Sequence, residues 1–476
     1  MRGINTDHSR ELREIALRLA STMRSIAALS SFGTVFLGRA FAAVIVPGAP
    51  WVDTSGNSIQ AHGGGLLKVD STYYWFGEDK ASNSALFQAV SCYTSTDLTT
   101  WTRQNNALTP ISGTMISNSN IVERPKVIFN KKNQEYVMWF HSDSSNYGAA
   151  MVGVASAKSP CGPYTYKTLL PLGAQSRDES IFQDGQRCGI AAQTSYLLYA
   201  SDNNQNFKIS RMDANYYNVT TQVNVLSGST LEAPGIIKRN GQYYLFASHT
   251  SGWDPNPNKW FVASSISSTF SAQSDLAPQS TRTYYSQNAF DLPLVSGNAI
   301  YMGDRWRSDI LSTSSYIWLP LTWASGSPQL VWADVWSLNL AAGTWSIASG
   351  TTYEAENGAL SGSAVILPTD SSFSGSKAVG YLGNGGSLTI TVQGIGAAQW
   401  VSFYIANGDS SWRSTTVSVN GGSAVTLQQP TTGGGHVVLS IPMKLTLRSG
   451  SNTITIGANQ SNYAADLDKV IVYTAT

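Results

Sequence analysis

A short strand pattern rich in aromatic residues recurs five times in the first two thirds of the chain. Each copy follows a turn-like stretch, and a shorter apolar segment precedes most copies. The five copies begin at Tyr73, Tyr136, Tyr196, Tyr243 and Ala299. Short strands at intervals of about 50–60 residues are typical of a propeller, with one four-stranded sheet per repeat. The pattern therefore predicts an all-β protein with a five-bladed β-propeller. A β-sandwich with coincidental aromatic strands is the alternative.

Beyond residue 348 the pattern changes to strict alternation of apolar and polar residues, interrupted by Gly and Ser turns. The alternating segments lie at 387–392, 400–405, 437–441, 453–456 and 468–473. Such alternation predicts a β-sandwich (jelly-roll) module. We expect a propeller domain at 43–348, a linker at 349–352 and the sandwich at 353–476.

The N-terminal segment has the layout of a secretory signal peptide. Residues 26–38 are uncharged and mostly apolar, Arg24 precedes them, and Ala-Phe-Ala follows at 40–42. The apolar run is too short to cross a bilayer. We expect residues 1–42 to be removed and the protein to be secreted to the extracellular space. Met23 would be a natural start for this peptide, and a buried apolar segment is the alternative.

Composition narrows the class of partner. The formal net charge is +1, charged residues make up 12% of the chain and aromatic residues 11%. This balance predicts neither a nucleic-acid partner nor a membrane partner. A neutral carbohydrate is compatible with it, since sugar rings stack on aromatic faces, and we expect a monomer.

Three cysteines and two sequons bear on the expected compartment. The odd cysteine number leaves the pairing open; we expect a Cys161–Cys188 disulfide, with Cys92 as a small buried residue. Asn218 and Asn459 each begin a glycosylation sequon, which predicts a glycoprotein.

Polar residues upstream of the aromatic strands point to one site. The innermost strand of a blade lies before the repeated strand, and its start faces the central funnel. These positions hold His62, Glu123, Asp178, Glu232 and Gln287. Carboxylates at equivalent positions of several blades predict an acidic site on the axis, although each would alternatively be a solvated loop charge. Further candidates for sugar contacts, each alternatively a blade-packing residue, are His62, Glu78, Tyr147, Trp253, Asp304 and Trp306.

Two motifs resemble glycoside hydrolase family 43. They are Ser-Arg-Asp-Glu-Ser-Ile-Phe-Gln-Asp-Gly at 176–185 and Glu-Ala-Pro-Gly-Ile-Ile-Lys-Arg-Asn-Gly-Gln-Tyr-Tyr-Leu at 232–245, within a resemblance that covers residues 45–348. The resemblance implies that Glu232 is the general acid and that Asp178 modulates its pKa and orients it.

The first repeat departs from that family pattern. It reads His-Gly-Gly at 62–64, and no acidic residue occurs between 54 and 69. In the family, an aspartate in this region is the general base. Together with Glu123 and Gln287, this departure is similar to the exo-β-1,3-galactanase branch of basidiomycete fungi. That similarity implies hydrolysis of the β-1,3-galactan main chain of arabinogalactan-proteins, with bypass of β-1,6 branches.

Inverting hydrolysis needs an acid for the leaving oxygen and a base for the attacking water. Glu232 must stay protonated, and an ionised Asp178 nearby would raise its pKa. The resemblance to this branch implies that a glutamine activates the attacking water. Gln287 would therefore position this water or act as the general base. Glu123 is chemically the better base and is the alternative; otherwise it binds sugar hydroxyls.

The C-terminal region resembles a family 35 carbohydrate-binding module. The Tyr-Glu-Ala-Glu-Asn opening and the last strand imply a structural calcium site at Glu354, Glu356 and Asp468, and hard oxygen ligands suit calcium. Two exposed strand carboxylates are the alternative, and no cofactor is expected for catalysis. The expected sugar-binding residues of the module are Tyr381, Trp412, Asn462, Tyr463 and Asp466.

Three functions remain after this reading. The first is an exo-acting, inverting β-1,3-galactanase. The second is another family 43 activity, arabinofuranosidase or xylosidase, and the missing first-repeat aspartate argues against it. The third is a catalytically inactive, lectin-like galactan-binding propeller. The missing base supports this third function, whereas Glu232 and Asp178 argue against it.

Overall fold

The computed structural model describes residues 43–170, 173–185 and 193–474, so the predicted signal peptide at 1–42 lies outside it. The described residues form an all-β structure, which confirms the predicted fold class at this level. No helix among them is long and apolar enough to cross a membrane. Their helical segments are single turns, at η1 (Gln279–Thr281), α2 (Arg282–Tyr285), η2 (Leu311–Thr313), η3 (Ala355–Asn357) and η4 (Ser374–Ser376).

Five four-stranded antiparallel sheets follow one another along the chain, and in each sheet every strand pairs with the next one in sequence. The first sheet contains β1 (His62–Val69), β2 (Thr72–Glu78), β3 (Val90–Ser95) and β4 (Thr102–Leu108). The second contains β5 (Ile121–Asn130), β6 (Glu135–Asp143), β7 (Met151–Ala157) and β8 (Thr165–Leu170). The third contains β9 (Glu179–Asp184), β10 (Thr194–Ser201), β11 (Asn206–Met212) and β12 (Val219–Leu226).

The fourth sheet contains β13 (Leu231–Arg239), β14 (Gln242–His249), β15 (Lys259–Ala263) and β16 (Ser274–Asp275). The fifth contains β17 (Gln287–Pro293), β18 (Ala299–Arg305), β19 (Ser315–Thr322) and β20 (Gln329–Leu330). A two-stranded sheet, β21 (Trp336–Asn339) and β22 (Thr344–Ile347), completes this part of the chain.

The repeated aromatic segments are the second strands of these sheets: β2, β6, β10, β14 and β18. Most of their residues are buried; β6, for example, has a single partly exposed residue. Neighbouring sheets cover both faces of such a strand, so its sequence is an apolar run with little alternation. Trp75, Trp139 and Leu197 are among the side chains that fill the spaces between sheets.

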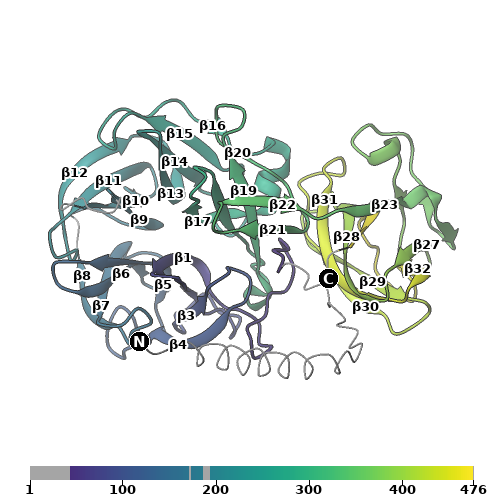
Figure 1. Cartoon of the computed structure of the whole chain (residues 1–476), viewed down its shortest axis with the longest axis horizontal. Coiled ribbons are helices and arrows are strands. Elements are labelled where there is room, and N and C mark those ends of the chain that lie inside the picture. Colours follow the sequence, from purple (N-terminus) through teal and green to yellow (C-terminus); the bar gives the residue numbers. More distant parts are fainter. Residues whose placement is uncertain (1–42, 171–172, 186–192, 475–476) are drawn as a thin grey trace, which may run out of the picture. The chain divides into compact units, whose positions relative to one another are not determined.

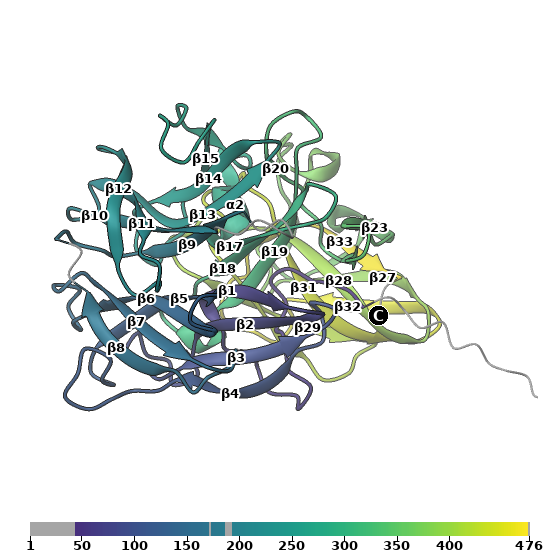
Figure 2. The ribbon, with the colours of Figure 1, turned by 60° about the vertical axis from the view of Figure 1, so that its left-hand side comes forward.

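The first strands of the five sheets form a closed ring. β1, β5, β9, β13 and β17 each contact the first strand on either side, and β17 contacts β1. Figures 1 and 2 show these strands around the centre of the five sheets. We call this arrangement the five-sheet ring. It brings residues far apart in sequence to one central channel.

Two further sheets follow the ring. One contains β23 (Gly350–Glu354), β25 (Val365–Ile366), β26 (Val379–Gly380), β28 (Ala397–Ala406), β31 (Leu439–Leu447) and β33 (Asp466–Tyr473). The other contains β24 (Ala359–Ser361), β27 (Ser387–Gly394), β29 (Arg413–Val419), β30 (Val425–Gln429) and β32 (Gly450–Ile456). The segment expected as a linker is therefore mostly strand, because residues 350–354 pair with β33.

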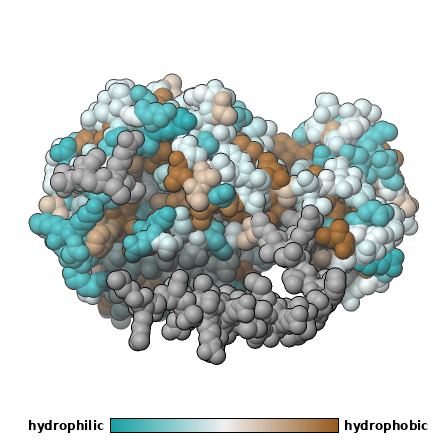
Figure 3. All heavy atoms as spheres, in the orientation of Figure 1, coloured by the Kyte–Doolittle hydropathy of each residue, from teal (hydrophilic) through white to brown (hydrophobic). Residues whose placement is uncertain are grey.

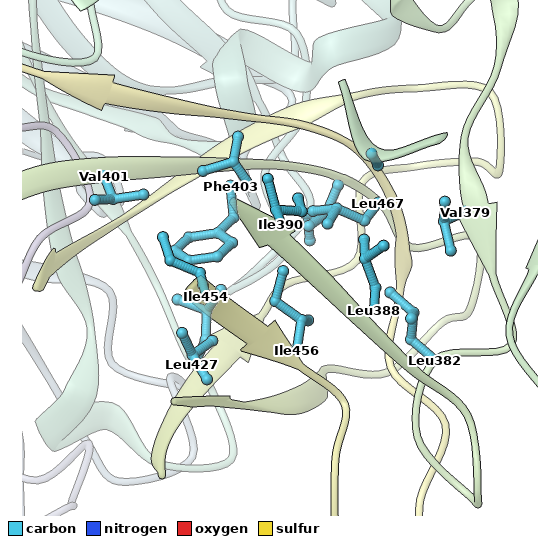
Figure 4. Packing of buried hydrophobic residues seen from close by; sticks show 14 of the residues in the cluster. Val379, Leu382, Leu388, Ile390, Val401, Phe403, Leu427, Ile454, Ile456 and Leu467 are labelled. Atoms are coloured by element: carbon cyan, nitrogen blue, oxygen red, sulfur yellow. The ribbon is translucent and has the colours of Figure 1, made fainter. Parts of the chain in front are cut away.

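The apolar residues of the alternating strands meet between these two sheets. Leu388 and Ile390 of β27 and Ile454 of β32 lie in one cluster with Val401 and Phe403 of β28 (Figure 4). The period-2 pattern of these strands follows from this burial of one face.

On the outer surface, Figure 3 shows polar residues over much of the described face, with hydrophobic residues in smaller patches.

One disulfide joins Cys92 of β3 to Cys161, with Cα atoms 5.6 Å apart. The expected Cys161–Cys188 pair is therefore wrong, and Cys92 is not a free buried thiol. Cys188 itself lies outside the described residues. The pairing follows from the contact between the first and second sheets, whose shared apolar cluster contains both Cys92 and Cys161.

Candidate active site

A cavity of about 380 Å³ lies where the first strands of the five-sheet ring begin. Its walls come from four of the first-strand positions predicted to converge and from the loops after the second strands. The lining residues are Glu78, Glu123, Arg124, His141, Asn146, Tyr147, Arg177, Asp178, Asn204, Glu232, Thr250, Gly252, Trp253, Gln287 and Trp306. Carboxylates separated by more than a hundred residues thus share one site.

A backbone irregularity at the start of the first strands directs two glutamates into this cavity. The pairing register shifts just after Glu123 in β5 and just after Glu232 in β13. The next residues, Arg124 and Ala233, have φ values of 53° and 54°. An extra residue in one strand bends it and re-aims the adjacent side chain. The Glu-Arg-Pro and Glu-Ala-Pro motifs are the sequence form of this bulge.

Glu232 is 92% buried and has a single side-chain partner among the described residues. Its Oε1 accepts a hydrogen bond from Gln287 Nε2 at 2.8 Å and a longer one from the Ser251 amide at 3.5 Å. Burial and the nearby Asp178 carboxylate raise the pKa of Glu232 to about 8. Burial is the larger cause, whereas the sequence argument named only Asp178. A carboxyl group with this pKa is protonated at neutral pH and can donate a proton.

Asp178 is held by an ion pair on the wall of the cavity. Its Oδ2 lies 2.7 Å from Arg124 Nε and accepts a hydrogen bond from the Ala233 amide at 3.1 Å. Ala233 follows Glu232 directly, so this bond places the Asp178 charge beside the protonated acid. These two contacts fix the orientation of the Asp178 carboxyl group.

Arg124 also fixes the amide of Gln287. Arg124 Nη2 donates to Gln287 Oε1 at 2.6 Å, and Trp306 Nε1 donates to the same oxygen at 3.1 Å. These two donors determine which end of the amide is oxygen, so the NH₂ group faces Glu232. Both lone pairs of Oε1 are occupied. For that oxygen to accept a proton from water, Arg124 or Trp306 must first move.

Glu123 lies on the same wall with both oxygens bonded. Tyr147 Oη donates to its Oε1 at 2.7 Å, and His141 Nδ1 lies 3.2 Å from its Oε2. Hydrogen bonds and charges from His141 and Lys80 outweigh burial and lower the pKa of Glu123. Glu123 is therefore an ionised acceptor, and its lowered pKa makes it a weak base.

The remaining cavity wall combines another ion pair with aromatic rings. Glu78 lies 2.8 Å from Lys80 Nζ and accepts a hydrogen bond from the Arg124 amide at 3.0 Å. Burial and the Glu123 charge raise the pKa of Glu78. Trp253 and Trp306 meet edge to face with ring centres 4.9 Å apart. Aromatic faces beside carboxylates suit a polyhydroxylated ring with apolar C–H faces.

The structure places two predicted sugar-binding residues outside the cavity lining. His62 is fully buried, hydrogen bonds to Asp304 through Nδ1 at 3.0 Å, and stacks on Tyr316. Asp304 also accepts a hydrogen bond from the Gly63 amide at 2.9 Å. His62 Nδ1 and both Asp304 oxygens are thus engaged outside the residues that line the cavity, while His62 Nε2 is buried with no hydrogen-bond partner among the described residues. The other four predicted residues, Glu78, Tyr147, Trp253 and Trp306, line it.

Several lining residues had not been singled out from the sequence: Arg124, His141, Arg177 and Asn204. Arg124 follows Glu123 in the repeated motif, and that neighbour relation was its signal. His141 pairs across the β5–β6 register with Glu123, which a hairpin count would have found. Arg177 and Asn204 sit on loops, where sequence pattern predicts little.

Three side chains at this cavity carry atoms of the kind that bind metal ions. Ligand atoms of Glu123, His141 and Asp178 lie within 4.8 Å of one another. Both ring nitrogens of His141 face carboxylates, so neither offers a lone pair to a cation. Asp178 is already paired with Arg124. The group is an ion-pair network.

The predicted sugar-binding residues of the C-terminal domain fall into two groups. Trp412, Asn462 and Tyr463 line a cleft of about 410 Å³ together with Arg307 of the ring. The Arg307 guanidinium lies 4.8 Å from the Trp412 ring centre, and Tyr285 packs edge-on against that ring. Tyr381 is exposed and meets Tyr463 edge to face, outside the cleft lining. Asp466 also lies outside the cleft lining, and burial raises its pKa.

The predicted calcium residues lie around one serine. Ser374 Oγ donates to Glu354 at 2.9 Å, and the Ser374 amide donates to Asp468 at 2.6 Å. Oε2 of Glu354 and Oε2 of Glu356 are buried with no hydrogen-bond partner in the described residues. Burial, Glu354 and Glu356 raise the pKa of Asp468 to about 6. Unpartnered buried carboxylate oxygens fit a hard cation such as calcium.

A buried glutamic acid with a raised pKa beside an aspartate, in a cavity walled by hydrogen-bond acceptors and tryptophans, is the arrangement expected of a glycoside hydrolase. The family model described as glycosyl hydrolases family 43 matches residues 64–285. A comparison with curated proteins gave no match. Several solved structures are also similar to this chain.

The structure of exo-β-1,3-galactanase from Phanerochaete chrysosporium with β-1,3-galactotriose is similar to this chain, with 69% sequence identity and a TM-score of 0.88. The similarity covers 90% of this chain and all of the galactanase chain. The same enzyme with galactose gives 70% identity, the same TM-score and the same coverage. Exo-β-1,3-galactanase from Clostridium thermocellum is 27% identical, with a TM-score of 0.60, over 91% of this chain and all of that one. The chain belongs to glycosyl hydrolase family 43.

Proposed function

We propose that this glycoside hydrolase is an exo-acting, inverting galactan β-1,3-galactosidase that removes galactose from β-1,3-galactan and bypasses β-1,6 branches. Similarity to the two fungal structures over 90% of the chain supports the substrate. The main observation that supports catalysis is the position and pKa of the Glu232 carboxyl group. It accepts a hydrogen bond from Gln287, lies near Asp178 and has a pKa of about 8. A cavity of about 380 Å³ is at the small end for ligand sites, which suits one chain end.

Each residue then has a role. Glu232 protonates the glycosidic oxygen. The Asp178 charge favours the protonated form of Glu232, and the hydrogen bond from the Ala233 amide to Asp178 orients Glu232. Gln287 holds Glu232 and positions the attacking water, while Glu123 accepts hydrogen bonds from sugar hydroxyls. The base remains a choice between two residues. To accept a proton from water, the Gln287 side-chain oxygen must first lose one of the two hydrogen bonds that it accepts. Glu123 would have to accept that proton although its pKa is lowered.

The domain assignments are part of the same proposal. The five sheets correspond to the blades of a five-bladed β-propeller, and the two C-terminal sheets to a carbohydrate-binding β-sandwich. We also propose secretion after removal of residues 1–42, and glycosylation at Asn218 and Asn459. The contiguous ring of sheets and the core between the two C-terminal sheets support the architecture.

A panel of substrates tests the activity. The protein is incubated with linear β-1,3-galactan, arabinan and xylan, and the released sugars are separated by chromatography. Galactose from galactan alone supports the proposal. Release of a pentose would indicate another family 43 activity, and binding to galactan without release would indicate an inactive binding protein.

Structural calcium at Glu354, Glu356 and Asp468 is proposed for the C-terminal domain, with no part in catalysis. A chelator should lower the melting temperature by about 5 °C, and calcium should restore it, since a ligand of the folded state alone stabilises it. Asp468→Asn should abolish this calcium response. Identical melting curves with chelator and with calcium would contradict the site.

A further inference from the structure

A buried histidine links two carboxylates at the wall of the cavity. His141, on β6, is 1% exposed. Its Nδ1 lies 3.2 Å from Oε2 of Glu123, and its Nε2 lies 2.9 Å from Oδ2 of Asp143. Glu123 reaches the cavity, whereas Asp143 is fully buried. The ring therefore connects a cavity residue to the interior of the second sheet.

This geometry sets the protonation state of His141. Carboxylate oxygens accept hydrogen bonds, so each ring nitrogen must carry a hydrogen, and a ring with two N–H groups is an imidazolium. Burial acts against that charge, but the hydrogen bonds that the ring donates to Asp143 and Glu123 outweigh it and raise the pKa of His141 to about 10.

Asp143 is a fixed anchor for the ring. Its Oδ1 accepts hydrogen bonds from the backbone amides of Ser144, Ala149 and Ala150, at 2.9, 2.7 and 2.9 Å. These bonds and the His141 charge lower the pKa of Asp143. A carboxylate bound by three backbone amides cannot rotate, so it holds the imidazolium in one orientation.

Glu123 stands in a crowded field of charge. The other titratable or charged groups that face this pair from neighbouring elements are Glu78, Lys80, Arg124, Tyr147, Asp178 and Glu179. Three of them are carboxyl groups, and ionised neighbours would favour protonation of Glu123. A protonated Glu123 would lose one of its acceptor sites for a substrate hydroxyl.

We infer that His141 is a positioning residue: its charged ring, anchored by Asp143, holds Glu123 as an oriented carboxylate that binds the sugar at the chain end. The inference rests on the proposed galactan hydrolysis. It makes His141 act through Glu123, without contact with the reacting atoms.

The first test measures the charge on the ring without using activity. The full chain is labelled with ¹⁵N-histidine, and its five histidines are followed by long-range ¹H–¹⁵N NMR between pH 5 and 9. One ring should keep two protonated nitrogens above pH 8, and its signals should vanish in His141→Gln. Absence of any imidazolium above pH 8 in the unaltered protein overturns the inference, whether or not the protein cleaves galactan.

The second test separates positioning from structural support. His141→Gln should raise KM for β-1,3-galactotriose about tenfold or more with a smaller effect on kcat. The acid limb of kcat/KM should move up by about one pH unit, because Glu123 loses the charge that keeps its pKa low. His436→Gln is the matched control, since that exposed histidine pairs with Asp370 in the C-terminal domain. An unchanged KM and acid limb in a folded His141→Gln protein would refute the positioning role.

Discussion

Replacement of Asp178 by asparagine should lower the pKa of the catalytic acid and move the basic limb of activity. The Asp178 carboxylate is the second cause, after burial, of the pKa of about 8 at Glu232. Asparagine keeps the shape of the side chain and removes its charge. Arg124 then loses its ion-pair partner, and its charge acts on Glu232 without compensation.

The size of the shift follows from the charge that is removed. Two unit charges roughly 6 Å apart repel by about 3 kcal/mol at an effective dielectric constant of about 20, equivalent to about 2 pKa units. Partial screening of Asp178 by Arg124 reduces this value. We therefore expect the pKa of Glu232 to fall by about 1–2 units in Asp178→Asn.

The sign is visible in a pH profile. A general acid works only while protonated, so activity is lost as pH rises through its pKa. In the unaltered protein the basic limb of kcat/KM on β-1,3-galactotriose should lie near pH 8. In Asp178→Asn it should lie about 1–2 units lower. A variant with lower activity but an unmoved basic limb would refute the role of Asp178 as pKa modulator.

Three further changes have defined outcomes. Arg124→Lys should lower kcat/KM about 100-fold in steady-state assays, since lysine cannot reproduce the planar fork of guanidinium contacts; a loss below threefold would contradict this. Cys161→Ser should lower the free energy of unfolding by about 2–4 kcal/mol in denaturant titrations, because it opens a link between residues 69 apart; equal stability would contradict it. Asp334→Ala should cost about 1–3 kcal/mol by calorimetry, as the hydroxyls of Tyr404 and Tyr473 lose their acceptor; an unchanged melting temperature would exclude this.

The second strands and the cavity positions were predictable because they repeat with the fold. Continuous apolar strands at regular spacing reflect burial between sheets, and the positions before them converge wherever such sheets form a ring. Glu123, Asp178, Glu232 and Gln287 come together for this reason. The paired Glu-x-Pro motifs already carried the bulge that directs two glutamates inward.

Other features depend on contacts that no local pattern encodes. His62 and Asp304 occupy plausible strand positions, but in the structure His62 pairs with Asp304 and stacks on Tyr316, outside the residues that line the cavity. The disulfide of Cys92 depends on packing between the first two sheets. The weight of burial in the pKa of Glu232 likewise depends on the closed walls of the cavity.

Glu232→Gln, measured on two substrates, tests the central claim most directly. Cleavage of β-1,3-galactotriose needs a proton on the leaving sugar, whereas 2,4-dinitrophenyl β-galactoside releases a stable anion without one. The account predicts a loss of about 10²–10⁴-fold on the trisaccharide and a much smaller loss on the aryl galactoside. Undiminished cleavage of the trisaccharide, or an equal loss on both substrates, would contradict the assignment of Glu232 as the general acid.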